Sequence, residues 1–428
     1  VLASCQSAGD ISIRPELPKG NDIGFNGLIV AASDLDTQYS VYANGVLDQI
    51  PGAQDTMSLL KPGPTSAPVI GTSEASHSVV GWPQIVDVSP NGQYLYTVET
   101  RGKPVPDLEK VDDIFTGLPE GSVLTVTDIS DPSVPSIVSK TEVGTDLNSV
   151  MVSPDGNSLI IATTDDLVIV DLDDGEVTDV HSFPIAKAGT ESERPGIRAA
   201  AVHPDSSHVA VNLDDRIVRF YRIDRAEGQP PELTAVGEDL RIGETLSAGA
   251  FHPSGDYFLI PDVSWGNNSG AADFLFNDAG SLFAVKFDPG GAHSIASETK
   301  VGLSPEGFAI SPDGTRIVTV NMYRTYLHDA FATSWVRGKK YASLSLLSFD
   351  ASTGQATVLD EQRFEGNLPE DAVFDADGDA LAVAIFEVKR LDDDMGYVGF
   401  WKIENDKLIN TGLATPVARG VHDLVLVP

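Results

Sequence analysis

A repeated pattern of two apolar segments around a tight turn constrains the fold of this chain more than any other feature of its sequence. Each copy has an apolar run, a turn rich in Pro, Asp, Ser and Gly, and a second apolar run, as in SVMVSPDGNSLIIATT. Apolar runs that flank such a turn predict a β-hairpin. The copies span residues 82–99, 147–164, 197–214, 246–263, 305–322 and 369–386.

The residues after most hairpins predict a larger, four-stranded unit. A third strand, often ending in Asp, is expected at 165–172, 215–224, 280–288, 341–350 and 396–403. A fourth and weaker strand then leads to the next copy. Four strands in about 50 residues form the blade of a β-propeller, so the pattern predicts an all-β fold.

Six full copies leave a seventh blade to be built from the two ends of the chain. Residues 420–428, GVHDLVLVP, look like a first strand that stops before its turn. Residues 27–50 contain GLIVAAS, QYSVYA and VLDQI, which look like later strands without a first. Their pairing would close the ring and remove the open sheet edges that favour aggregation. We therefore expect one seven-bladed β-propeller domain over residues 23–428, after a signal remnant and tether over residues 1–22.

The repeat pattern resembles that of a known class of propellers. The sequence of apolar run, SPDG turn and apolar run is similar to the YVTN-type and lactonase-like seven-bladed propellers of bacteria, over nearly all of residues 27–428. The stretch SVLTVTDISDPSVPSIVSKTEVG at 122–144 resembles the LVIVD repeat of exported propellers. The resemblance implies the fold but not one function, because this fold hosts binders, scaffolds, hydrolases, isomerases and lyases.

The single cysteine, Cys5, follows Leu-Ala-Ser. This LASC sequence resembles the lipobox of bacterial lipoproteins, which implies cleavage before Cys5 and acylation of its sulfur. Residues 1–4 would then be the remnant of a signal peptide. On this interpretation the protein is an exported, periplasmic or cell-surface lipoprotein of a bacterium and contacts the membrane through its lipid alone. The alternative is a chance LASC sequence in a disordered N-terminal segment.

Composition excludes several classes of function. A formal net charge of −35 repels nucleic acid and anionic lipid surfaces. One cysteine allows neither an intrachain disulfide nor a thiolate zinc site. The eight histidines form no His-x-His or His-Glu-x-x-His spacing, so we expect no protein-built metal site and no cofactor. His203 and His252 occupy the place of a turn serine, and the DADGD sequence at 375–379 occupies a blade turn, so we interpret all of these as turn residues.

Alignment of the blades predicts a ring of polar side chains. Residues one to three positions before the turn are mostly apolar, whereas the fifth residue before it is polar in all seven blades. The first strands of a propeller surround its central channel, so this ring is expected to line the channel mouth. Polar strand ends without a function are the alternative interpretation. The seven residues are Gln84, Asn148, Arg198, Ser247, Glu306, Glu370 and His422.

The same face is expected to carry the longest insertions, at 100–121, 263–280, 322–341 and 386–396. The blade 5 insertion combines basic and aromatic residues on an otherwise acidic protein. It holds Tyr323, Arg324 and Trp335, and the blade 4 insertion holds Trp265. An arginine and an aromatic ring together can bind a carboxylate or phosphate and stack against a ring. Packing onto the neighbouring blade is the alternative.

Three functions follow from this arrangement. The first is binding of an anionic small molecule or acidic sugar by Arg324, Trp265, Trp335 and the ring members Gln84, Asn148, Arg198 and Ser247. The second is a lactonase, isomerase or lyase at the same mouth. In that case His422, Glu306 or Glu370 would be the base, Arg198 or Arg324 would stabilise an anion, and Tyr323 would donate a proton. The third is an interaction scaffold with a protein partner on the loop-rich face. We expect a monomer, since a propeller closes on itself.

Overall fold

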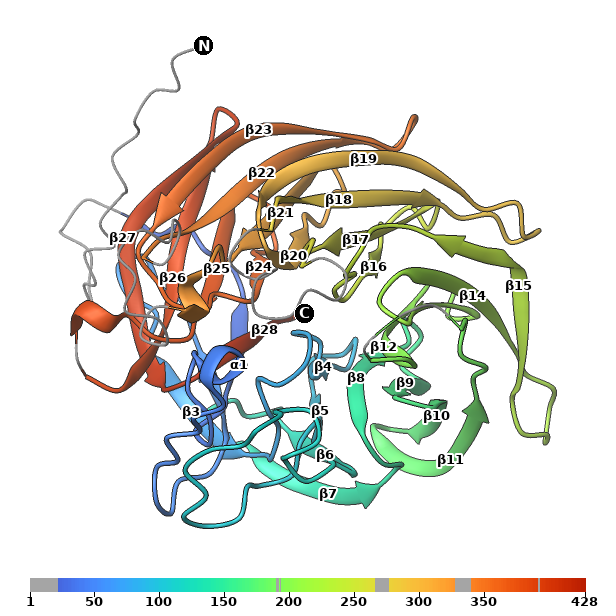
Figure 1. Ribbon diagram of the computed structural model, residues 1–428, viewed down its shortest axis with the longest axis horizontal. Coiled ribbons are helices and arrows are strands. Elements are labelled where there is room, and N and C mark those ends of the chain that lie inside the picture. Colours follow the sequence, from blue (N-terminus) through green and yellow to red (C-terminus); the bar gives the residue numbers. More distant parts are fainter. Residues whose placement is uncertain (1–21, 190–191, 193, 266–276, 328–339, 392) are drawn as a thin grey trace.

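The computed structural model describes residues 22–428 except 190–191, 193, 266–276, 328–339 and 392. Over these residues 28 strands form seven antiparallel four-stranded sheets, arranged around a common centre like the blades of a propeller (Figure 1). The all-β, seven-bladed fold expected from the repeats is therefore confirmed. No helix among the described residues combines the length and hydropathy needed to cross a lipid bilayer.

Blades 1 to 3 follow the chain from the centre outward. Blade 1 contains β4 (Val86–Val88), β5 (Tyr94–Val98), β6 (Val123–Asp128) and β7 (Ser136–Glu142). Blade 2 contains β8 (Leu147–Val152), β9 (Ser158–Thr163), β10 (Asp166–Asp173) and β11 (Glu176–Pro184). Blade 3 contains β12 (Ile197–Val202), β13 (His208–Leu213), β14 (Ile217–Asp224) and β15 (Glu232–Arg241).

Blades 4 to 6 repeat the same order. Blade 4 contains β16 (Ala250–Phe251), β17 (Tyr257–Asp262), β18 (Ala279–Lys286) and β19 (Ser294–Leu303). Blade 5 contains β20 (Pro305–Ile310), β21 (Arg316–Asn321), β22 (Ala342–Asp350) and β23 (Gln355–Phe364). Blade 6 contains β24 (Ala372–Phe374), β25 (Ala380–Ile385), β26 (Met395–Glu404) and β27 (Lys407–Ala418).

Blade 7 joins the two ends of the described chain. Its strands, from the centre outward, are β28 (Val421–Val427), β1 (Leu28–Ser33), β2 (Thr56–Leu60) and β3 (Val69–Glu74). Strands β28 and β1 are antiparallel, with Leu28 opposite Val427 and Ala31 opposite Leu424. The predicted closure of the ring by the C-terminal strand is thus present in the structure.

The assignment of the other N-terminal strands was wrong. QYSVYA is not a strand, because residues Val41–Asn44 form the short helix α1, which ends at Gly45 with φ 69°. VLDQI contributes only an isolated bridge between Val46 and Lys110. Both segments belong to a long connection from β1 to β2 that lies over the other blades, where burial of Tyr39 and Val41 in loop contacts replaces strand pairing. Two short 3₁₀ helices, Thr325–Leu327 and Lys389–Leu391, lie in the insertions of blades 5 and 6.

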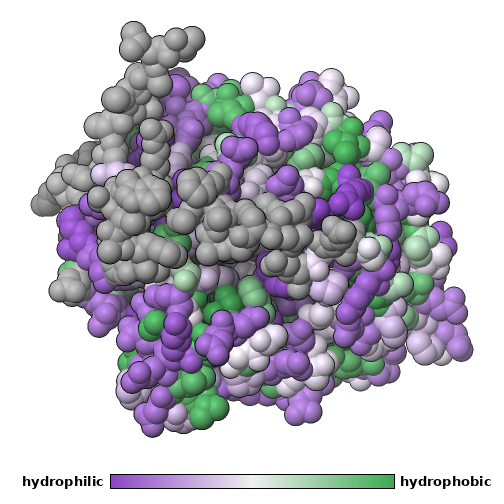
Figure 2. Space-filling view, viewed as in Figure 1, coloured by the Kyte–Doolittle hydropathy of each residue, from purple (hydrophilic) through white to green (hydrophobic). Residues whose placement is uncertain are grey.

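Burial follows the position of each strand in its blade. The second strands β9 and β13 are fully buried, and their apolar side chains pack between neighbouring blades. The outermost strands, such as β11, are largely exposed. Hydrophilic residues predominate on the face seen in Figure 2, with only scattered hydrophobic ones, which agrees with the high negative charge.

Side chains on the inner strands bond neighbouring blades to one another. Asp423 Oδ2 accepts hydrogen bonds from the N–H groups of Ile85 (2.7 Å) and Val86 (3.2 Å) in blade 1. Asp371 Oδ2 accepts one from the Leu424 N–H (3.0 Å) in blade 7. Because the inner strands are too far apart to form a continuous sheet, these carboxyl groups satisfy backbone donors that would otherwise be buried without a partner.

Candidate functional site

The seven aligned polar residues lie at or just before the first residues of the seven inner strands. Asn148, Arg198, Glu306 and His422 lie within β8, β12, β20 and β28, and the other three lie two or three residues before β4, β16 and β24. Six of them are buried, and Gln84 is half-buried. The ring is therefore part of the protein interior, where each unpaired polar group has a large effect on its neighbours.

Blades 5, 6 and 7 contribute an acidic and imidazole half of the ring. His422 Nε2 lies 3.1 Å from His77 Nδ1, so the two imidazoles share a hydrogen bond. His422 Nδ1 lies 3.9 Å from Glu370 Oε2. Neither carboxyl oxygen of Glu370 has a hydrogen-bond partner among the described residues, although its side chain is fully buried. Such an orphaned buried carboxyl is the kind of group that a ligand or water would satisfy.

Burial shifts the titration of these groups strongly. Burial raises the pKa of Glu306 to about 8, although the charge of Arg194 lowers it. Burial and the nearby Glu306 raise the pKa of Glu370 well above its ordinary value. Burial lowers the pKa of His77 to about 4 and that of His422 well below its ordinary value. Around neutral pH this half therefore holds carboxyl protons and neutral imidazoles, which is a composition suited to acid–base chemistry.

Three arginines, of which Arg198 belongs to the ring, lie at the opposite half of the ring. Arg198 Nε lies 3.6 Å from Asp215 Oδ1, and both side chains are buried. Burial, together with the positive charges of Arg194 and Arg101, lowers the pKa of Arg198 to about 10, although Asp215 and Asp146 raise it. The three arginines therefore lie within electrostatic reach of one another. Arg101 in turn bonds Asp146. The three guanidinium ions outnumber the two carboxylates described beside them, those of Asp146 and Asp215, which favours an anionic ligand.

Three neutral ring members make bonds inside the protein. Ser247 Oγ donates to the Glu306 carbonyl oxygen (2.6 Å). Asn148 Nδ2 donates to the Ile197 carbonyl oxygen (2.9 Å). The Gln84 amide reaches across the channel and donates to the Gly249 carbonyl oxygen (3.4 Å). These contacts connect blades 1, 2 and 4 to other blades, so the three residues also stabilise the closed ring.

Loops from several blades cover the ring. They form an apolar cap cluster of Tyr39, Val41, Leu47, Val79, Val80, Val111, Ile114, Leu118, Met322, Tyr326, Leu327, Leu368 and Phe386. Helix α1 in this cap carries Tyr42, whose hydroxyl donates to the Val79 carbonyl oxygen and accepts from the Gly81 N–H (3.3 Å). Burial, followed by the charges of Glu370 and Glu306, raises the pKa of Tyr42 well above its ordinary value. Tyr42 is therefore close to the acidic half of the ring.

A cavity of about 570 Å³ opens beside the cap cluster. Tyr42, Arg194 and Trp265 are among its lining residues, together with the blade 1 insertion around Phe115. The Arg194 guanidinium lies 4.2 Å from the centre of the Phe115 ring. Arg194 and Tyr42 line the cavity and both interact electrostatically with Glu306, so its wall lies near Glu306, while none of the seven ring residues is among its lining residues. Its volume is in the range of small-molecule sites.

The residues singled out in the insertions of blades 4 and 5 lie in different surroundings. Trp265 packs against Trp82 and Tyr326, with ring centres 6.2 and 5.8 Å away, and donates from Nε1 to Ser304 Oγ (3.0 Å). Arg324 donates to the Asn277 carbonyl oxygen (3.0 Å) and is buried.

The structure brings Trp265 to the cavity but directs Tyr323 away from the ring. The Tyr323 hydroxyl donates to Glu361 Oε1 (2.8 Å) on the outermost strand of blade 5. Trp335 and Cys5 lie outside the described residues.

Four further residues contribute to the site without having been singled out from the sequence as members of it. Tyr42, His77, Arg101 and Arg194 all lie in connections between strands or blades. Their positions depend on how long loops fold over the mouth, whereas the ring follows from a strand register. The sequence offered one signal for His77, because this histidine lies only a few residues before the first aligned copy, which starts at residue 82.

The fold and its buried polar centre define a seven-bladed β-propeller with a covered channel mouth. No family model matches the chain, and no curated protein matches it. Solved structures with the same fold include the periplasmic gluconolactonase of Pseudomonas aeruginosa, which is 14% identical over 94% of this chain and 99% of its own, with a TM-score of 0.63. A Bacteroides uniformis protein with a provisional assignment as a 6-phosphogluconolactonase is 13% identical over 97% and 100%, with a TM-score of 0.62.

A third similar structure has no assigned function. It is a protein from Desulfotomaculum acetoxidans, 10% identical over 94% of this chain and 98% of its own, with a TM-score of 0.60. At these identities the comparisons establish the shared fold alone.

Proposed function

We propose that this propeller is a lactonase-type hydrolase that opens the lactone of a small sugar acid at the channel mouth. One observation carries the proposal: Glu306, a buried carboxyl with a pKa of about 8, lies within electrostatic reach of Arg194 and Tyr42 in the wall of the cavity. A carboxyl group that keeps its proton near neutral pH and lies close to residues of a cavity wall is a candidate general acid.

Lactone hydrolysis needs three kinds of group, and the mouth contains each of them. Water that attacks the carbonyl carbon must lose a proton, and the neutral imidazole of His422 can accept it. Negative charge develops on the carbonyl oxygen, and Arg194 in the cavity wall, with Arg198 within its electrostatic reach, would stabilise it. The ring oxygen that leaves must gain a proton, which Glu306 holds. The carboxyl group of Glu370, 3.9 Å from His422, would orient that imidazole.

Two further observations favour a sugar lactone as the substrate. Trp265 lines the cavity and packs against Trp82, and indole rings stack well against the C–H face of a sugar. The arginine half of the ring would bind a carboxylate or phosphate on the same molecule. The fold shared with a gluconolactonase agrees with this proposal without requiring it.

The test compares Glu306→Gln with the unmodified protein on glucono-1,5-lactone and phosphorylated sugar lactones. Proton release at pH 6.5 would be followed above the spontaneous rate. We expect kcat to fall by about 100-fold, the lower limit for loss of a general acid, with KM changed less than twofold. Glu176→Gln on the exposed strand β11 is the matched control and should keep full activity. Full turnover by Glu306→Gln would contradict the assigned role.

Ligand binding without turnover is the second candidate, and the grouping of Arg101, Arg194 and Arg198 favours it. A binding protein would hold the open sugar acid, with its permanent carboxylate, more tightly than the lactone. Calorimetry with gluconate and glucuronate would detect this binding. If the protein binds these acids but hydrolyses none of the lactones, the enzyme proposal is wrong and the binder proposal stands. Arg198→Met should then weaken binding by at least tenfold.

The location of the protein is a separate proposal. We propose export and attachment to a membrane through a lipid on Cys5, supported by the LASC sequence and by the absence of any other cysteine. Mass spectrometry of the membrane fraction from a bacterial host expressing the full gene would detect the acyl chains. If the protein with Cys5 and the Cys5→Ser variant appear in the same cell fractions, the lipid anchor is excluded. The proposed monomer and any partner on the loop-rich face can be examined in the same material by light scattering.

A further inference from the structure

The turn between the first and second strands of each blade brings three side chains together. These are the first residue of the turn and the residues two and five positions later. They converge because the turn reverses the direction of the chain. In blade 2 Ser153 Oγ donates to Asp155 Oδ1 (2.6 Å) and accepts from the Ser158 N–H (3.0 Å). These turns lie at the opposite ends of the inner strands from the polar ring, so they are independent of the proposed active site.

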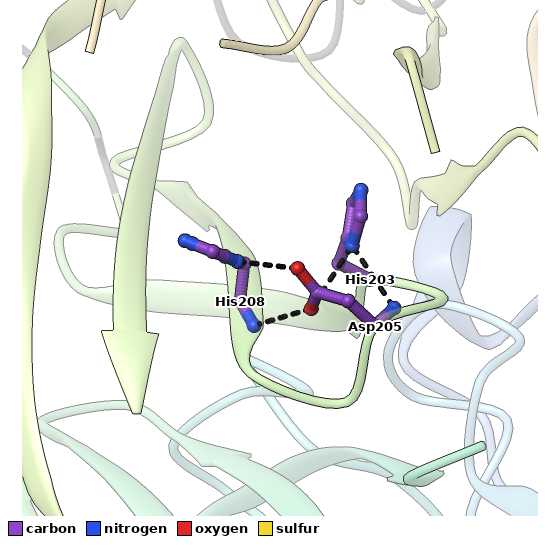
Figure 3. Close-up of side chains that lie close together, drawn as sticks. All are labelled: His203, Asp205 and His208. Atoms are coloured by element: carbon purple, nitrogen blue, oxygen red, sulfur yellow. Dashed lines mark hydrogen bonds and ion pairs between the residues drawn. The ribbon is translucent and has the colours of Figure 1, made fainter. Parts of the chain in front are cut away.

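Blade 3 alone among the described blades has a metal-ligating side chain at all three turn positions. They are His203, Asp205 and His208 (Figure 3). His203 Nδ1 lies 3.0 Å from Asp205 Oδ1, and His208 Nδ1 lies 2.7 Å from Asp205 Oδ2. The three ligand atoms all lie within 4.8 Å of one another. We propose that this cluster binds a divalent transition-metal ion through two imidazole nitrogens and one carboxylate oxygen, with water in the remaining positions.

The two imidazoles and the carboxylate suit a particular class of ion. Zn²⁺, Co²⁺ and Ni²⁺ accept mixed nitrogen and oxygen ligands, whereas Ca²⁺ and Mg²⁺ prefer oxygen alone. Three protein ligands leave at least one position for water or another small molecule. The site is therefore expected to select transition metals over the alkaline earths.

A second layer of contacts orients His203 for this role. Its Nε2–H donates to the Gly255 carbonyl oxygen (2.9 Å) in the next blade, which leaves the Nδ1 lone pair facing Asp205. Metal-binding histidines commonly use their second nitrogen in this way. Phe251 and Phe287 pack on the imidazole with ring centres 4.8 Å away. The ring is thus held in position before any ion binds.

The bonds already present at the turn are compatible with an ion. The Asp205 N–H lies 3.1 Å from His203 Nδ1, and an ion would replace this bond. The turn keeps its other bonds, because Asp205 Oδ1 accepts from the N–H groups of Ser207 (2.8 Å) and His208 (3.1 Å). Oδ2 contacts only His208 Nδ1 and is the oxygen available to the ion. The ion would take the place of the contact between His208 Nδ1 and Oδ2, with the imidazole proton carried on Nε2.

Charge and access also favour a cation at this place. Asp205 contributes a carboxylate that lies 3.0 Å from one imidazole nitrogen and 2.7 Å from the other. Its side chain is 40% exposed, which gives an ion a path from solvent. Arg222, opposite His208 on β14, is paired with Asp224 (2.7 Å) and so does not neutralise Asp205. The net charge of −35 attracts cations.

Blade 4 provides a natural control within the same chain. His252 stands at its first turn position and donates from Nε2 to the Gly314 carbonyl oxygen (2.9 Å), as His203 does to Gly255. Ser254 and Tyr257 occupy the positions of Asp205 and His208. A histidine at the first position therefore serves to connect two blades, and the additional ligands of blade 3 are the carboxylate and the second imidazole. The fold accepts Ser and Tyr at these places.

The experiment exchanges the two turns in the full chain. The double variant Asp205→Ser/His208→Tyr copies the blade 4 turn into blade 3, and Ser254→Asp/Tyr257→His copies the blade 3 turn into blade 4. Chelator-treated proteins are titrated with Zn²⁺ and with Ni²⁺ by calorimetry. We expect the unmodified chain to bind one equivalent that the first variant loses, or binds at least tenfold more weakly, while its circular dichroism is unchanged. The second variant should bind one additional equivalent.

Three results would overturn the proposal. The first is that the unmodified protein binds neither ion. The second is that the first variant binds them as tightly as the unmodified protein, and the third is that 1 mM Mg²⁺ removes the bound Zn²⁺. Asp205→Asn keeps an acceptor for the Ser207 and His208 N–H groups while removing the negative charge. It therefore gives a second measurement if the double variant fails to fold, and it too should weaken Zn²⁺ binding by at least tenfold.

Discussion

Replacement of Asp423 by asparagine should make the protein less sensitive to rising pH. Asp423 lies on β28, is 3% exposed, and shares a hydrogen bond with Asp371 of blade 6. Burial raises its pKa from 3.8 to about 7. The unfolded chain therefore gives up this proton at lower pH than the folded chain. The free energy by which protonated Asp423 stabilises the fold is fully present below about pH 3.8. It is lost as the pH rises through about 7.

The magnitude follows from the size of the shift. A displacement of about three pH units corresponds to about 4 kcal/mol at ~1.4 kcal/mol per unit, and most of it is lost between pH 4 and pH 8. Asparagine has no such titration. Its carbonyl oxygen can still accept from the Ile85 and Val86 N–H groups, because both bond the same oxygen of Asp423. Its amide can donate to an oxygen of Asp371, a hydrogen bond that would replace the one that Asp371 donates to Asp423.

Urea unfolding of both proteins at pH 4 and pH 8 would measure the effect. We expect the unmodified protein to lose about 3 kcal/mol more than Asp423→Asn over this range, because the variant lacks the Asp423 carboxyl. Asp423→Ala is the control: it leaves two buried N–H groups without an acceptor and should cost about 2–4 kcal/mol at both pH values. Equal pH dependence in the unmodified protein and the asparagine variant would refute the reasoning.

Two further predictions concern stability. Gly420 has φ 82°, and a Cβ there would lie 1.9 Å from the Asp34 carbonyl oxygen, so Gly420→Ala should cost about 3 kcal/mol or more. Gly52→Ala, at φ 80° with nothing within 4 Å, should cost only about 1 kcal/mol, and thermal unfolding of both variants would show whether the close contact matters. Trp401 is fully buried, and its indole N–H donates to Gln362 Oε1 (2.7 Å). Trp401→Phe should therefore lower the free energy of unfolding, measured by urea titration, by about 2–3 kcal/mol. An unchanged value would mean that the site repacks.

The fold could be predicted from the sequence because each blade specifies its own local structure. The turn sequences around Ser89, Ser153 and Ser311 bond their own backbone, so they form wherever the apolar runs permit a hairpin. Closure of the ring was predictable because a lone first strand at 420–428 needs a partner. The segments QYSVYA and VLDQI were misassigned because strand-forming residues in a connection can be buried by loops instead.

Predictability of the candidate site differs between strands and loops. Strand register places Glu306, Glu370 and His422 at one level, since each lies the same distance before its turn. The sequence does not say that Tyr42 lies near these carboxyls, because that contact depends on a long connection from another blade. The cluster around Asp205 was missed for a related reason: its histidines are five residues apart, and only the reversal of the chain at the turn brings them together.

The pairing of β1 with β28 has a consequence for how the chain reaches its native state. Strand β1 is synthesised long before its inner neighbour β28, so blade 7 stays incomplete until β28 has been made. During that time one edge of β1 is available to other nascent chains. Contacts so distant in sequence also make folding slow. We expect refolding to be limited by this final docking step and to depend more on chaperones than the stability of the finished ring would indicate.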